Sequence, residues 1–303
     1  MPLDNKKTIL CWSLYDWANS AFATTVMACF FPIFFKEYWS AGADVNESTF
    51  KLGLANSLAG VLVALSAPLL GAIADRGTVK KKFLLFFAFL GVVMTCCLSL
   101  VAKGQWVFAV VLYVFATVGF SGGNIFYDAL LTGVASKRKM NTVSALGFAL
   151  GYLGGGILMS LNVWMYLRPT TFGFTDDGQA VRFAFLTVGI WWAVFSIPLF
   201  LFVKEPTDPH AQRGWESVKA GLKQLRGTLG KIRRLKTVLL FLIAYWFYID
   251  GVDTIVRMAV DYGKSLGFED KDLITALLLV QFIGFPATLA FAYLANRIGD
   301  KLA

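Results

Sequence analysis

Carboxylate and amide side chains interrupt several apolar stretches of this sequence, and they are the residues with the greatest capacity for chemistry. One early stretch carries Asp16 and Asn19, and a later one carries Asn124 and Asp128. Asn124 and Asp128 are four residues apart, so on a helix they share one face. An ionisable group in apolar surroundings is costly to bury and by default marks a binding or proton-transfer pathway. The asparagines have a second interpretation, because amides also hydrogen-bond neighbouring helices and fix their packing.

A third polar group lies within residues 237–260. Its members occupy positions i, i+3, i+4 and i+7 of a helix and therefore form one stripe: Asp250, Asp253, Thr254 and Arg257. Asp253 and Arg257 have the spacing of an ion pair along the helix, which leaves Asp250 as the less compensated carboxylate. Such a group is a candidate for substrate binding or proton exchange. The alternative is a structural hydrogen bond to a neighbouring helix.

Enzymatic motifs are absent from the sequence. It has no phosphate-binding loop and no HExxH motif, and its one histidine, His210, lies in a polar segment. The four cysteines fall in apolar stretches without zinc-site or disulfide spacing: Cys11, Cys29, Cys96 and Cys97. We therefore expect no enzyme, no cofactor and no metal site.

The elements that position these residues are apolar runs of membrane-spanning length. Hydrophobic residues make up 57% of the chain and charged residues 16%, whereas soluble domains carry about 25% charged residues. Each run approaches or exceeds the roughly 20 residues that cross a bilayer. The runs cover residues 9–35, 52–74, 83–102, 105–133, 143–167, 183–203, 237–260 and 273–295. The sequence thus predicts an all-α membrane protein with about eight transmembrane helices.

The distribution of Lys and Arg predicts the orientation of these helices. The net charge of +9 resides in short loops and not on a soluble face, which argues against a nucleic-acid partner. If the N-terminus is cytoplasmic, the inner segments carry twenty Lys and Arg residues and the outer segments seven. Cytoplasmic loops are enriched in these residues. We therefore expect a multi-pass inner-membrane protein with both ends of this chain in the cytoplasm.

The long polar segment 204–236 divides the chain into residues 1–203, with six helices, and residues 237–303, with two. Apolar residues recur in it at alternating steps of four and three: Val218, Leu222, Leu225, Leu229 and Ile232. Basic residues occupy the other faces. This pattern predicts an amphipathic helix on the inner membrane surface, with anionic lipids as partners of residues 210–236. A solvated linker helix is the alternative.

Two further patterns concern how helices approach one another. Gly147, Gly151 and Gly155 recur at four-residue steps, which predicts a small-residue face for close helix contact. Between the second and third helices, Asp75 and Arg76 precede a basic cluster. Asp75 could sit against a neighbouring helix N-terminus, where the helix dipole favours an anion. This loop is either a gate or a simple topogenic signal.

The loop resembles the signature of the major facilitator superfamily, Gly-x-x-x-Asp-Arg followed by basic residues. The matching positions are Gly71, Asp75, Arg76 and Lys80. Residues 15–22, YDWANSAF, and 248–255, YIDGVDTI, resemble motifs of its vacuole-effluxer-like branch. The resemblance implies a twelve-helix fold of two six-helix bundles, with helices 1, 4, 7 and 10 lining a central cavity. Because only eight helices are present, the chain is expected to be truncated at its C-terminus.

The resemblance also implies a function. The expectation is a secondary active transporter of small polar metabolites that works by alternating access, with amino-acid efflux and proton coupling as its specific forms. Asp16, Asn19, Asn124 and Asp128 would lie on the pathway together with the stripe from Asp250 to Arg257. The signature loop would act in gating. The alternative is a membrane receptor or assembly scaffold that transports nothing.

Overall fold

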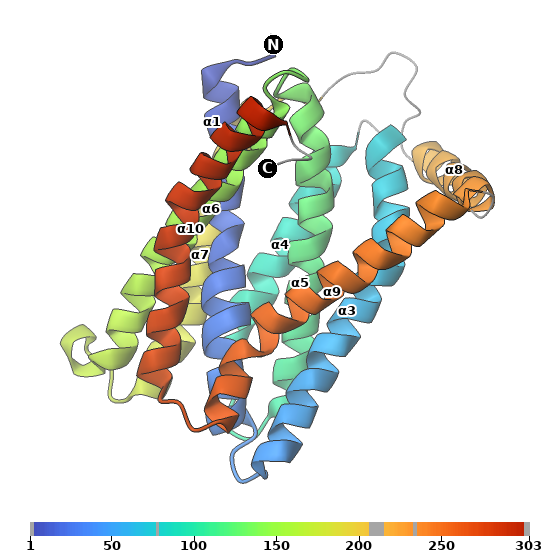
Figure 1. The fold of residues 1–303 in the computed structure, drawn as a ribbon. Helices are drawn as coiled ribbons and strands as arrows, with labels where there is room; N and C mark the ends of the chain where they lie inside the picture. The colour runs from blue at the N-terminus through green and yellow to red at the C-terminus, as the bar shows by residue number, and fades with distance from the viewer. Residues whose placement is uncertain (1–2, 77–78, 206–214, 233–234, 300–303) are drawn as a thin grey trace.

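The chain is predominantly helical over the residues that the computed structural model describes, which are 3–76, 79–205, 215–232 and 235–299. These ranges contain no strand. Eight helices in them are long and apolar enough to cross a membrane. They are Lys6–Trp39, α3 (Val45–Arg76), α4 (Lys80–Leu98), α5 (Trp106–Leu130), α6 (Met140–Leu167), α7 (Asp177–Phe202), α9 (Lys236–Ser265) and α10 (Asp270–Ile298). The predicted all-α membrane fold is confirmed (Figure 1).

The first spanning helix is the most enclosed one and changes its winding along its length. It consists of α1 (Lys6–Ala21), the π-helix η1 (Phe22–Phe30), α2 (Phe31–Phe34) and a second π-helix, η2 (Phe35–Trp39). Pro32 lies between the two π-helices and has no N–H for the regular ladder, which accounts for irregular winding here. The ring of Phe31 stacks on that of Tyr113 from α5, with centroids 3.9 Å apart. This helix therefore forms the centre of the core.

Glycines bring α6 against α1. A Cβ on Gly151 would lie 2.5 Å from Ser20 Oγ, and one on Gly154 would lie 2.7 Å from the backbone oxygen of Trp17. Only a residue without a side chain fits at such separations. The prediction that this stripe serves close helix contact is confirmed.

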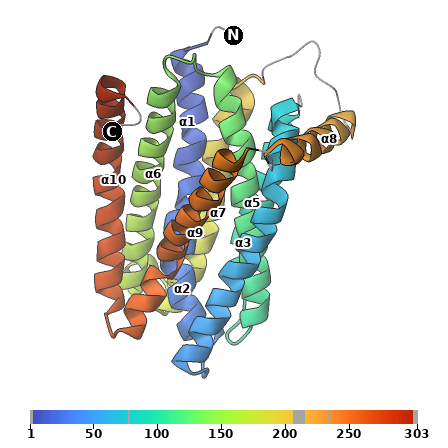
Figure 2. The same ribbon diagram turned by 45° about the vertical axis from the view of Figure 1, so that its right-hand side comes forward.

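The helix α8 (Trp215–Ile232) is not one of the spans and lies across the end of α3 (Figure 2). Its backbone approaches α3 closely, since a Cβ on Gly221 would lie 3.0 Å from the carbonyl oxygen of Ala72. The side chains of Lys219, Lys223 and Arg226 are exposed. The predicted helix is present, while residues 210–214 and 233–234 of the proposed lipid-binding segment, His210 included, lie outside the described residues.

The last two spans dock on the other helices separately. α10 runs alongside α6, and α9 slants across the bundle towards α3 and α8 (Figures 1 and 2). Buried residues of α9 are confined to its C-terminal end: Val260, Asp261 and Gly263. The rest of α9 is held away from the core, and this separation leaves a cavity between α9 and α3.

Candidate functional site

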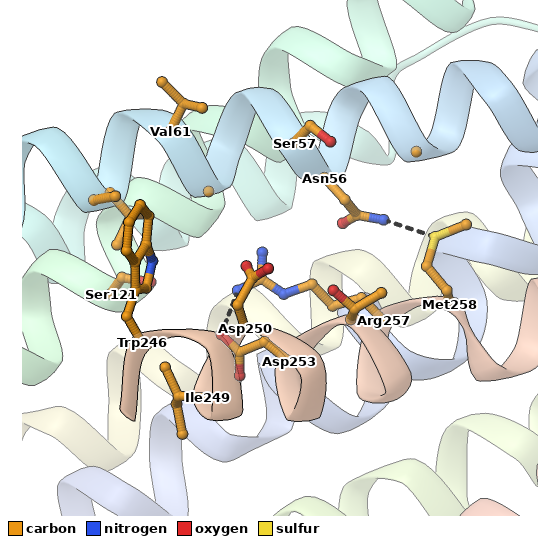
Figure 3. Close-up of a pocket in the computed structure, with 15 residues that line it drawn as sticks. Asn56, Ser57, Val61, Ser121, Trp246, Ile249, Asp250, Asp253, Arg257 and Met258 are labelled. Carbon is orange, nitrogen blue, oxygen red and sulfur yellow. Dashed lines mark hydrogen bonds and ion pairs between the residues drawn. The ribbon is translucent and has the colours of Figure 1, made fainter. Parts of the chain in front are cut away.

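A cavity of about 580 Å³ lies between α3 and α9, with Ser121 of α5 also in its wall. Its polar lining comes mainly from two helices far apart in sequence: Asn56 and Ser57 on α3, and Asp250, Asp253, Thr254 and Arg257 on α9. Figure 3 shows the side chains of Asn56, Asp250 and Arg257 extending into the space between the two helices. The stripe expected on residues 250–257 therefore faces a cavity large enough for a small molecule.

Charge is unevenly compensated within this cavity. Arg257 Nη2 donates to Asp253 Oδ2 at 3.4 Å, and this confirms the predicted ion pair within α9. The side chain of Asp253 is 58% exposed while that of Arg257 is 14% exposed. A long pair with one open partner is easily rearranged by a charged ligand. The cavity thus offers both a guanidinium and carboxylates to a polar substrate.

Asn56 ties the wall of the cavity to the core. Its Oδ1 accepts a hydrogen bond from Tyr113 Oη at 2.9 Å, and its Nδ2 lies 3.3 Å from the sulfur of Met258. One amide therefore connects α5, α3 and α9. Reasoning from sequence did not place Asn56 at the site, although an amide in the middle of an apolar run was the available signal. Ser57 and Ser121 gave no signal, because serines in spanning helices commonly bond to their own backbone.

The other predicted pathway residues form a second group, between α1 and α5. Asn19 Nδ2 donates to Asn124 Oδ1 at 2.6 Å, so these two amides meet across the helix interface. Asp16 is half-buried, and its Oδ2 would lie 3.2 Å from a Cβ placed on Gly147 of α6. Asp128 is exposed and close enough to Asp16 for their charges to interact. The structure therefore brings Asp16, Asn19, Asn124 and Asp128 together, but the lining found for the α3–α9 cavity does not include them.

Aromatic side chains hold this second group in place. Trp12 stacks on Tyr127 with ring centroids 4.3 Å apart, and its Nε1 donates to the backbone oxygen of Tyr127 at 3.1 Å. A Cβ on Gly147 would lie 2.9 Å from Tyr127 Oη, so this hydroxyl and the Asp16 carboxylate border the same small space. A phenol beside a carboxylate can hydrogen-bond it in either protonation state.

The residues expected in gating surround the α3–α4 connection. Gly71 has open space where a Cβ would be, Asp75 is exposed, and Arg76 ends α3 with a side chain outside the described set. The backbone N–H of Lys80 donates to Glu205 Oε1 at 2.6 Å. The carboxylate seen at the N-terminus of α4 is thus Glu205, which follows α7.

Eight spans and a charged cavity between two of them define a polytopic membrane protein of the transporter class. Residues 40–302 match the family described as "Vacuole effluxer Atg22 like". The chain belongs to this family.

Relatives in bacteria and fungi bear this out. The chain is 36% identical over 297 residues to the uncharacterized MFS-type transporter YxiO of Bacillus subtilis (strain 168), covering 96% of this chain and 68% of that protein. It is 24% identical over 307 residues to autophagy-related protein 22 of Eremothecium gossypii, covering 86% of this chain and 59% of that protein. It is 23% identical to autophagy-related protein 22-1 of Penicillium rubens, covering 84% of this chain and 54% of that protein. The chain thus spans little more than half the length of these fungal relatives.

Proposed function

We propose that this protein is a secondary active transporter that moves small polar metabolites through the cavity between α3 and α9 by alternating access. The observation that carries the proposal is the placement of Arg257 and two carboxylates, Asp250 and Asp253, on the wall of a cavity of about 580 Å³. Charged side chains within spanning helices are rare and mark substrate and ion pathways. Residues 1–203 and 237–303 would contribute the two sides of the pathway, connected by residues 204–236.

Zwitterions such as amino acids are the substrates that this lining suits. A guanidinium binds a carboxylate through two parallel hydrogen bonds, and Asp250 or Asp253 can accept from an ammonium group. The description of the family as effluxers supports export as the direction. The excess of basic residues in alternate loops supports a cytoplasmic location for both ends of this chain, in the inner membrane of a bacterial cell.

Proton coupling is assigned to the group between α1 and α5. Asp16 and Asp128 are neighbouring carboxyl groups that repel each other when both are ionised, and protonating one of them relieves that repulsion. Asp16 also borders the hydroxyl of Tyr127. Because none of the four residues of this group is in the lining described for the cavity, uptake of a proton would act through helix movement and not through contact with the substrate. Gly71, Asp75, Arg76 and Lys80 are proposed to gate the inner side.

Anionic lipids are the proposed partners of the region around α8. Lys219, Lys223 and Arg226 are exposed on this helix, and a basic helix at a membrane surface is attracted to acidic headgroups. The close contact between Gly221 and Ala72 would transmit a change in its position to the end of α3.

Counterflow in proteoliposomes tests the transport proposal. Labelled amino acids should accumulate in vesicles preloaded with unlabelled substrate, and Asp250→Asn should abolish this accumulation. Asp16→Asn should abolish accumulation driven by an imposed proton gradient. Asp272→Asn is the matched control, because Asp272 is an exposed carboxylate in the first turn of α10. Full transport by folded Asp250→Asn protein would remove the assignment of this residue. An absence of accumulation and of ligand-dependent stabilisation for every metabolite tried would favour a receptor or scaffold.

A further inference from the structure

Three charged or polar residues from three helices meet at one end of the cavity. Lys36 Nζ of η2 lies 2.8 Å from Asp261 Oδ1 of α9. Thr49 Oγ1 of α3 donates to Asp261 Oδ2 at 2.9 Å, and Lys36 Nζ donates to Thr49 Oγ1 at 3.2 Å. Each of the three residues thus contacts the other two, and together they join α9 to the helices that precede residue 77.

A second cluster lies beside the first and adds α6 and α10. Lys264 of α9 pairs with Glu37 of η2, and its Nζ lies 2.7 Å from Asp270 Oδ1 at the start of α10. Tyr166 Oη of α6 donates to Asp270 Oδ2 at 3.2 Å. We call the two clusters together the seven-residue network: Lys36, Glu37, Thr49, Tyr166, Asp261, Lys264 and Asp270. It lies where α9 turns into α10, at the end of the bundle opposite the start of α1 and the end of α10 (Figures 1 and 2).

The first cluster is more buried than a surface ion pair, whereas Glu37 at the edge of the second cluster is 51% exposed. The side chain of Asp261 is 1% exposed, that of Lys36 is 12% exposed and that of Lys264 is 13% exposed. Removing one partner of such a pair leaves a buried charge without compensation, which is strongly unfavourable. Moving the partners apart into water instead hydrates both charges. The network therefore has two favourable arrangements, fully joined or fully hydrated, as a conformational switch requires.

The position of the network relative to the cavity indicates what it closes. Met258 and Arg257 line the cavity, and Asp261 follows them by one helical turn on α9. On the opposite wall, Asn56 and Gly53 line the cavity, and Thr49 precedes Gly53 by one turn of α3. Both walls thus lead from the cavity into the network within a single turn.

We propose that the seven-residue network is the gate that closes this end of the cavity, and that it separates as one unit when the cavity opens there. In alternating access, this gate is the barrier on the side of the cavity away from α8. This part of the inference rests on the proposed function. The burial of α9 only at Val260, Asp261 and Gly263 agrees with a single contact region that one rearrangement can release.

Labelling of a cysteine in the cavity tests the gate without any need for transport. The Ser57→Cys change, in a variant whose four natural cysteines are replaced by alanine, places a thiol on the cavity wall. A membrane-impermeant maleimide is added only to the network's side of sealed vesicles. We expect slow labelling in this background, at least tenfold faster labelling with Asp261→Asn, and a return to slow labelling with the reversed pair Lys36→Asp/Asp261→Lys.

Glu47→Gln is the matched control. Glu47 Oε1 pairs with Lys51 Nζ at 2.6 Å four residues away on the same helix, so this pair joins no two helices. Its loss should leave the labelling rate unchanged. Thr49→Val removes two hydrogen bonds and no charge, and it should raise the rate severalfold even if Asp261→Asn does not fold.

Unchanged labelling in folded Asp261→Asn or Thr49→Val protein would overturn the gate. So would a reversed pair that folds and labels as fast as Asp261→Asn. Because labelling reads access to the cavity, the outcomes also separate this inference from the proposed function. A protein that transports nothing but labels as expected keeps the gate, and one that transports normally with unchanged labelling loses only the gate.

Discussion

Asn19 and Asn124, which are 105 positions apart in the chain, form a hydrogen bond of 2.6 Å between α1 and α5. Asn19 is fully buried, and both residues belong to polar groups that interrupt apolar stretches. Of the two interpretations that an amide in a spanning helix permits, interhelical bonding is thus realised in the structure. A pathway role for the same residues would require this bond to open during the transport cycle.

Breaking the Asn19–Asn124 bond from one side should destabilise the protein. Asn124→Ala leaves a buried amide of Asn19 without this partner, which costs about 1–3 kcal/mol. The double variant Asn19→Ala/Asn124→Ala should be less destabilised than the two single effects combined, because no amide is then left unpaired. Unfolding in detergent would measure both. Asn296→Ala is the control, since Asn296 makes an exposed bond to Thr142. Additive single effects would contradict a direct interaction.

The α1–α6 contact should not tolerate a methyl group. Gly154→Ala places a Cβ 2.7 Å from the backbone oxygen of Trp17, which cannot move without shifting α1, and overpacking of this kind costs about 1–3 kcal/mol. Gly60→Ala on α3 meets no atom within 4 Å and should be neutral or stabilising by up to about 1 kcal/mol. Melting temperatures of the two variants in detergent provide the comparison. Similar values for both would mean that the interface can separate freely.

Glu205 and Lys81 cap two helices reciprocally. Glu205, beyond α7, accepts from the N–H of Lys80 at the start of α4, and Lys81 Nζ donates to the backbone oxygens of Phe200 and Val203 at 2.8 Å. The Glu205 carboxylate lies at the N-terminus of α4 and the Lys81 ammonium at the C-terminus of α7, where the helix dipoles favour a negative and a positive charge respectively. Glu205→Ala should lower the free energy of unfolding by about 1 kcal/mol. Glu47→Ala, which removes only an exposed pair within α3, should change it much less. Equal effects would show that the cap contributes nothing beyond a surface charge.

Spacing along the sequence predicted those features that depend on a single helix. The Asp253–Arg257 pair follows from an i, i+4 separation, and the packing face of Gly151 and Gly155 follows from steps of four. The eight spans follow from length and apolar composition. In each of these cases helix geometry alone fixes the relation between the residues.

Contacts between helices could not be predicted in this way, because spacing does not say which helices are neighbours. Lys36 and Asp261 are 225 positions apart, and nothing local marks them as partners. The crossing of α4 and α5 is similar, where a Cβ on Gly119 would lie 2.5 Å from the backbone nitrogen of Gly91. The separation of Asp16 from the α3–α9 cavity also depends on packing, since nothing in its local sequence distinguishes the two locations.

Asp176 should make a small, pH-dependent contribution to stability. It precedes α7 and accepts from the N–H of Gln179 at 2.7 Å, and this hydrogen bond lowers the pKa of the Asp176 carboxyl below its usual value of 3.8. A lowered folded-state pKa stabilises the protein above the unfolded-state pKa, and the stabilisation is lost as the pH falls through the folded-state value. Asp176→Asn keeps a capping oxygen without the charge. Its melting temperature should lie slightly below that of the wild type near pH 6, and the difference should vanish as the pH falls through the folded-state pKa, which lies below 3.8. A difference that persists in acid would exclude the carboxylate as its source.

Arg257 should be needed for substrate binding itself and not only for neutralising Asp253. Arg257→Gln should weaken binding at least tenfold, or about 1.4 kcal/mol, because the cavity loses the group that pairs with a carboxylate. Arg257→Lys should restore it only partly, since an ammonium lacks the planar fork. Substrate-induced thermal stabilisation measures binding directly, and Arg297→Gln, which removes an exposed guanidinium over the ring of Tyr293 on α10, is the control. The double variant Asp253→Asn/Arg257→Gln separates the two roles. If the ion pair were only structural, this neutral pair would bind as the wild type does, whereas a guanidinium that contacts the substrate leaves the double variant at least as weak as Arg257→Gln.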